Sequence, residues 1–87
     1  MLIAKVTGSI VSTQKEDTLI GKKLMIIQPI NSDGEITRIE EVACDTVGAG
    51  IGEYVLVTRG SSARAAFETQ DNVIDLAIIA IIDSFDK

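Results

Sequence analysis

The 87-residue sequence has no histidine, no tryptophan and a single cysteine, and its three aromatic residues are Tyr54, Phe67 and Phe85. Histidine is the commonest general base and metal ligand, so its absence removes the usual basis for acid–base catalysis. One cysteine forms neither an internal disulfide nor a cysteine-cluster zinc site within one chain. We therefore predict that the protein is not an enzyme and has no catalytic site, no metal and no cofactor.

Basic residues are also scarce, with 8 lysines and arginines against 13 aspartates and glutamates, for a formal net charge of −5. Nucleic-acid binders need clustered lysine and arginine to displace counterions, and single-strand binders also need stacking aromatics. The sequence has no apolar run of 18 residues, and we expect no signal peptide. These features predict a cytoplasmic protein that binds neither nucleic acid nor a membrane.

Isoleucine and valine, fourteen and seven residues, make up about a quarter of the chain, which favours β-strands. The length fits one domain, residues 1–87. Gly8 inside the first apolar–polar alternation predicts a bend or bulge, and Asn31 to Gly34 predict a turn. A short helix, capped by Ser61 or Ser62, is expected between the fourth and fifth strands. The predicted strands are residues 2–10, 24–30, 42–47, 53–59 and 75–83.

A glycine-rich stretch between the third and fourth strands has Gly48, Gly50 and Gly52 at every second position. Dinucleotide-binding loops have the spacing Gly-x-Gly-x-x-Gly and lead into a helix N-terminus that meets the phosphates. Here the spacing is shorter, and the strand-like residues 54–57 follow. We therefore predict a tight structural turn and not a phosphate site.

The second, fourth and fifth predicted strands are apolar on both faces, although a sheet with one wet face should alternate. The predicted helix is too short to cover the additional faces, and the mean hydropathy of the chain is +0.30. Neighbouring copies of the same chain are the simplest cover. Cys44 is predicted to be a small buried hydrophobe, because no basic residue adjoins it to activate the thiol.

Five segments of the sequence form a distinctive combination. They are STQK at 12–15, LIGKKLMII at 19–27, DTVGAGIGEYVLV at 45–57, GSSAR at 60–64 and IDLAIIAIID at 74–83. Together they resemble the bacterial microcompartment vertex proteins, the pentameric shell proteins of the EutN/CcmL type. The resemblance covers nearly the whole chain and is nearest to the propanediol-utilisation (PduN-like) type.

This resemblance implies a mainly β fold, a small five-stranded OB-like β-barrel with one short helix, which assembles as a cyclic pentamer. It further implies a structural role in the cytoplasm, where the pentamer caps the fivefold vertices of a microcompartment beside hexameric and trimeric shell proteins. We hypothesise that the glycine turn contacts neighbouring shell proteins at an edge, through Gly48, Ala49, Gly50, Gly52 and Glu53. The hypothesised subunit interface contains Gly60, Ser61, Ser62 and Arg64.

Two alternatives belong to other functional classes. A free OB-like barrel that binds a ligand or nucleic acid would need a basic groove with aromatic side chains, which the sequence lacks. An enzyme subunit that borrows catalytic groups from a partner would need activity that the chain's own residues do not suggest.

Overall fold

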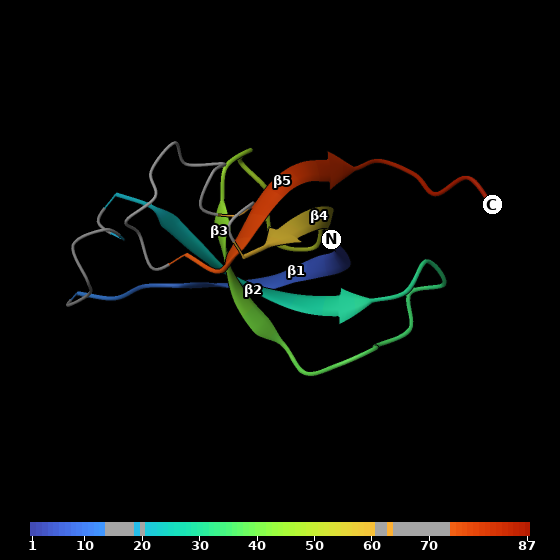
Figure 1. The fold of residues 1–87 in the computed structure, drawn as a ribbon, viewed down its shortest axis with the longest axis horizontal. Helices are drawn as coiled ribbons and strands as arrows, with labels where there is room; N and C mark the ends of the chain where they lie inside the picture. The colour runs from blue at the N-terminus through green and yellow to red at the C-terminus, as the bar shows by residue number, and fades with distance from the viewer. Residues whose placement is uncertain (14–18, 20, 61–62, 64–73) are drawn as a thin grey trace.

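Five strands close into a barrel in the order β1-β2-β3-β5-β4 (Figure 1). The structure is a computed structural model and describes residues 1–13, 19, 21–60, 63 and 74–87. The predicted five-stranded barrel is confirmed, although the third strand ends at Asp45 and not at Val47. The strands are β1 (Leu2–Ile10), β2 (Lys23–Ile30), β3 (Glu41–Asp45), β4 (Tyr54–Arg59) and β5 (Leu76–Ile82).

The barrel is closed by β5, which pairs with β4 on one side and with β3 on the other. All the strand pairs are antiparallel except β3 and β5, which are parallel and share the pairs Cys44↔Ala77 and Asp45↔Ile78. Thr46 extends this short seam, because its backbone N–H and its Oγ1 both donate to the carbonyl oxygen of Ile78, at 3.2 and 2.6 Å. Closure leaves none of the five strands with a free edge.

Two irregularities in the register let the strands curve around the barrel. One lies in β1 between Val6 and Gly8, and the other lies between β4 and β5 at Leu56 and Val57. A Cβ atom added at Gly8 would lie 3.3 Å from Cδ1 of Ile26, so β2 packs closely where β1 bends. The bend predicted at Gly8 is therefore confirmed.

Inward-facing aliphatic side chains fill the barrel. Burial of one such side chain contributes about 1.5–3 kcal/mol to folding. The alternation predicted for the first strand is confirmed, because Ala4 and Val6 are fully buried while Lys5 and Thr7 are exposed. The core consists of Ala4, Val6, Met25, Ile27, Ala43, Ala49, Val55, Val57, Leu76 and Ile78.

A second, smaller apolar cluster lies on the outer face of the barrel. Cys44 of β3 and Ala77 of β5 are buried there, under Ala63 and Ile74, and Leu19 packs against them. We expected only other copies of the chain to cover these outer faces, so that expectation is wrong in part. The chain covers some of its own surface with residues from connecting segments that are mostly polar.

The predicted helix begins at Ser61 or Ser62, which lie outside the described residues, as do residues 64–73. Ala63 is described; its backbone is helical and its side chain is fully buried. In the described ranges, no helix has the length and apolar character needed to cross a membrane.

Candidate assembly surfaces

The glycine turn, residues 46–53, joins β3 to β4 and takes its shape from two carboxylates. The Asp45 carboxylate accepts hydrogen bonds from the backbone N–H groups of Val47, at 2.9 Å, and Ala49, at 2.8 Å. At the other end, Oε1 of Glu53 accepts from the N–H of Gly50 at 2.6 Å. The bonds at Asp45 turn the backbone away from the β-ladder, which explains why β3 ends there.

Two of the three glycines in the turn have a backbone conformation that favours glycine. Gly48 has φ = 79° and Gly52 has φ = 94°, whereas Gly50 is not in the positive-φ region. The turn is tied to β1 through Val6: its carbonyl accepts from the Gly52 N–H at 2.7 Å, and its N–H donates to the Glu53 carbonyl at 2.9 Å. The tight structural turn predicted from the glycine spacing is confirmed.

The surface of this turn is more apolar than the hypothesised edge residues suggest. Gly48, Gly52 and Glu53 are exposed and Gly50 is half-buried, but the side chain of Ala49 packs in the barrel core. Only the backbone of Ala49 is therefore available for an edge contact. Sequence reasoning missed the side chains that the turn does present, namely Val47, 40% exposed, and Ile51, 65% exposed. The edge contact itself stays a prediction.

The hypothesised subunit interface begins at Gly60, where β4 ends. Gly60 has φ = 69°, and its N–H donates to the Asp75 carbonyl at 2.8 Å. Ser61, Ser62 and Arg64 lie outside the described residues, so their interface role stays a prediction.

The preceding residue, Arg59, was not among the hypothesised interface residues, yet it makes two ion pairs. Its Nη2 lies 3.3 Å from Oε2 of Glu41, and its Nη1 lies 3.8 Å from Oδ2 of Asp75. The Arg59 side chain is 40% exposed, so each pair contributes at most about 1 kcal/mol. Arg59 thus links the start of β3 to the residue before β5.

Residues 31–40 form an arm between β2 and β3. Its first turn is the predicted one: Oδ1 of Asn31 accepts from the N–H groups of Asp33, at 2.9 Å, and Glu35, at 3.0 Å. The returning segment is held to the end of β2 by the bridge between Ile30 and Ile36. The arm leaves Ile36 72% exposed and Ile39 83% exposed. Sequence reasoning did not single out these two isoleucines, since they occur singly among polar residues.

The C-terminal tail lies at the same end of the molecule as the arm (Figure 1). Lys87 forms an ion pair with Asp33 of the arm. Phe85 packs edge-to-face on Tyr54, with ring centroids 5.9 Å apart, and Nζ of Lys5 lies 5.8 Å from the centroid of the Tyr54 ring. The arm and the tail thus form one continuous surface.

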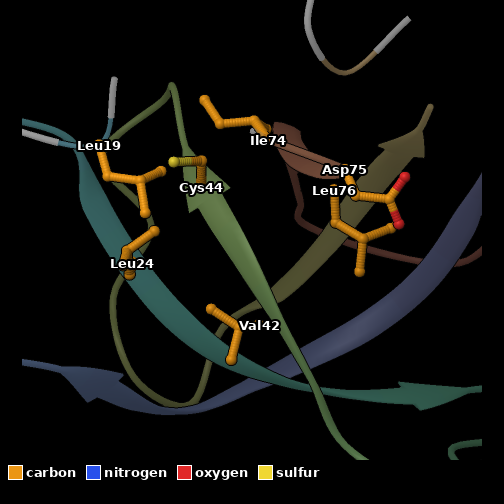
Figure 2. A pocket seen from close by; sticks show the side chains of 7 residues that line it. All are labelled: Leu19, Leu24, Val42, Cys44, Ile74, Asp75 and Leu76. Atoms are coloured by element: carbon orange, nitrogen blue, oxygen red, sulfur yellow. The ribbon is translucent and has the colours of Figure 1, made fainter. Parts of the chain in front are cut away.

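A pocket of about 220 Å³ lies at the opposite end of β2 (Figure 2). Six of its seven lining residues are apolar or thiol-bearing, and Asp75 is the acidic one. We call it the Cys44 pocket. It is lined by Leu19, Leu24, Val42, Cys44, Ile74, Asp75 and Leu76.

The Cys44 thiol is almost completely buried, as predicted. Burial raises the pKa of the thiol above its ordinary value of 9.0, while Lys22 lowers it and Asp45 raises it to a smaller extent. Because the thiolate is the reactive form and the thiol is buried, the folded protein slows the reaction of this cysteine with reagents in solvent.

We therefore expect Cys44 to react slowly with Ellman's reagent at pH 8 and rapidly once the protein is unfolded in guanidinium. Because the pKa of the folded state is raised, the thiol's contribution to stability is complete below pH 9 and is lost as the pH rises through the higher folded value. A Cys44→Ala variant should lack this part of the alkaline stability loss. Equal reaction rates in the folded and unfolded protein would contradict the assignment.

The described residues contain no group of three or more histidine, cysteine, aspartate or glutamate side chains that could hold a metal ion.

Comparisons with known proteins show the family of the chain. Residues 1–83 match the family described as "Ethanolamine utilisation protein EutN/carboxysome". The chain is 50% identical to the bacterial microcompartment shell vertex protein PduN of Salmonella typhimurium, over 97% of both chains. It is 52% identical to the carboxysome shell vertex protein CcmL of Thermosynechococcus vestitus, over 100% of this chain and 88% of the relative.

A solved structure agrees with the sequence comparisons. The GrpN pentameric microcompartment shell protein from Rhodospirillum rubrum superposes with a TM-score of 0.89 at 39% identity, covering 100% of this chain and 99% of that one. The resemblance to vertex proteins that the sequence motifs indicated is confirmed.

Proposed function

Since the chain belongs to the EutN/CcmL family, we propose that it is a structural shell protein whose pentamers occupy the fivefold vertices of a bacterial microcompartment. The observation that carries this proposal is its similarity, over nearly the whole chain, to shell vertex proteins and to a pentameric shell protein. The alternative of an OB-like binding module has no support in these comparisons. As a structural protein, the chain needs no catalytic residues.

The proposed mechanism is geometric. A flat layer of hexagonal tiles cannot close, and fivefold rings at its corners supply the curvature that closes it. Such a ring forms when the contact between identical subunits is head-to-tail and returns to its start after five copies. A head-to-tail contact joins one surface of a subunit to a different surface of the next subunit. The barrel has apolar surface at both ends of β2, so two such surfaces are present.

The test of this function is shell closure. The protein would be co-expressed with the hexameric shell proteins of its own microcompartment, and the particles would be examined by electron microscopy. We expect closed polyhedra with this protein at their corners, and open or elongated assemblies when it is omitted. Equally closed polyhedra in its absence would contradict the vertex role.

We propose further that the exposed face of the glycine turn contacts the neighbouring hexameric and trimeric shell proteins. Gly48 and Gly52 have no side chains to cover the backbone of this face. The space beside them is open, because a Cβ atom at either position would meet nothing within 4 Å in the same chain. Ile51 adds an exposed apolar side chain beside them. Backbone of a neighbour could therefore approach the turn closely.

Replacing Gly50 with glutamine tests this contact, because Gly50 lacks the positive φ that a side chain would strain. We expect rings of unchanged mass but open or leaky shells, since the new side chain occupies the proposed contact. Native mass spectrometry would measure the rings, and electron microscopy of the co-expressed shells would measure closure. Normal closure would show that the turn is not a shell edge.

A further inference from the structure

We propose that Ile36 on the arm of each subunit inserts into the Cys44 pocket of the next subunit in the ring. This inference rests on the pentamer proposed above and assigns the two surfaces that meet between its subunits. It is carried by three features of the chain: a firmly held arm with exposed isoleucines, an apolar pocket of matching size, and the placement of the two at opposite ends of β2.

The arm presents its isoleucines from a defined backbone. The Asn31 side chain holds the first turn through Asp33 and Glu35, and Nε2 of Gln28 donates to the Arg38 carbonyl at 2.7 Å on the return. Ile36, between these two anchors, is 72% exposed. Because the backbone is already ordered, burying Ile36 against a partner costs little additional conformational entropy.

The Cys44 pocket has the size and chemistry to accept one aliphatic side chain. Its volume of about 220 Å³ is below the range of about 300–1,000 Å³ that is typical of small-molecule sites. It exceeds the volume of about 150 Å³ in which an apolar cavity accepts benzene. Val42 borders the pocket and is 46% exposed, so part of this apolar lining faces outward (Figure 2).

The positions of Ile36 and the Cys44 pocket on the barrel indicate that a second copy of the chain fills the pocket. Ile36 pairs with Ile30 at the last residue of β2, whereas the pocket residue Leu24 is near its first. Val42, which also lines the pocket, lies opposite Ile26. Ile30 is thus four to six strand positions from the pocket, or about 13–20 Å, so Ile36 does not reach the pocket of its own chain. Figure 1 shows the arm projecting beyond the end of β2. The arm and the pocket are two different surfaces at opposite ends of the strand, and a head-to-tail ring joins two such surfaces.

One charged residue on the arm is complementary to one at the pocket. Arg38 is exposed on the arm, two residues from Ile36, and none of the ion pairs among the described residues includes it. Asp75 lines the pocket, and its side chain is 67% exposed. When Ile36 of one subunit enters the pocket of the next, the Arg38 guanidinium approaches the exposed Asp75 carboxylate. There it joins Arg59, whose Nη1 lies 3.8 Å from Oδ2 of Asp75.

Cysteine cross-linking tests the contact, because the single native cysteine lines the pocket. Burial slows the reaction of Cys44 with reagents in solvent, but a thiol at position 36 that is seated in the pocket lies beside its sulfur, and this proximity favours the disulfide. An Ile36→Cys variant of the full chain would be oxidised with diamide, which accepts the two hydrogens released as the disulfide forms. We expect a ladder of covalent species up to the pentamer on a non-reducing gel. Trypsin cleavage after Arg38 separates positions 36 and 44, so peptide mass spectrometry should identify a linked pair containing both.

Two matched variants and a measurement of the ring's mass complete the test. Adding Cys44→Ala to Ile36→Cys should abolish the ladder, and Ser32→Cys, on the same arm but away from Ile36, should give little cross-linking to Cys44. An intact ring without a 36–44 link would overturn the proposed contact and leave the pentamer standing. A wild-type protein that forms no ring would instead contradict the proposed function.

Discussion

Replacing Ile78 with alanine is expected to lower the free energy of unfolding by about 2–5 kcal/mol. Ile78 is fully buried in the core and pairs with Val57 of β4 and Asp45 of the parallel strand β3. The truncation removes apolar atoms that folding buries away from water, and it leaves a cavity at the seam where the barrel closes. Because small domains are stable by only about 5–15 kcal/mol, this loss takes a large share of the total.

Chemical denaturation in urea measures this effect, with each variant at the same protein concentration, because the stability of an oligomer depends on concentration. The matched control is Val11→Ala, since Val11 is 92% exposed and its truncation should change stability by no more than about 0.5 kcal/mol. Similar losses in the two variants would show that Ile78 is not a core residue.

The second large effect is expected at Gly52. Its φ of 94° is one that a β-branched side chain rarely adopts, so Gly52→Val should cost about 1–3 kcal/mol of stability. A Cβ atom at Gly52 would meet nothing within 4 Å, so the cost arises from backbone strain and not from a clash. Relief of that strain would disturb the 2.7 Å hydrogen bond from the Gly52 N–H to Val6.

Gly50→Ala provides the control for Gly52, because the two glycines share the turn but not the conformation. An added Cβ at Gly50 lies 3.3 Å from Oε1 of Glu53, at the far end of a flexible side chain that can shift. We expect its midpoint of urea denaturation to stay near that of the wild type, while Gly52→Val shifts to clearly lower urea. Equal shifts would contradict the explanation from positive φ.

The strands were predictable from the sequence because their cause is local. Ala4 and Val6 alternate with polar residues on β1, and Gly60 interrupts the β-branched run of β4. The end of β3 was not predictable in this way. It depends on the Asp45 carboxylate, which bonds to backbone N–H groups up to four residues ahead in place of the ladder.

The candidate assembly surfaces were only partly predictable. The glycine spacing indicated the turn, but not that Ala49 faces the core while Ile51 faces outward. The Cys44 pocket combines Leu19 and Ile74, which are more than fifty residues apart and lie in connecting segments. No periodicity marks such residues, because their contacts depend on how the closed barrel brings distant loops together.

The mass of the purified protein in solution tests the central claim most directly. We predict a single species of five times the 9.3 kDa subunit mass, measured by native mass spectrometry and by light scattering at neutral pH. A 9.3 kDa monomer that persists as the protein concentration is raised would contradict the account, because it would show that the apolar surfaces at the two ends of β2 need no partner.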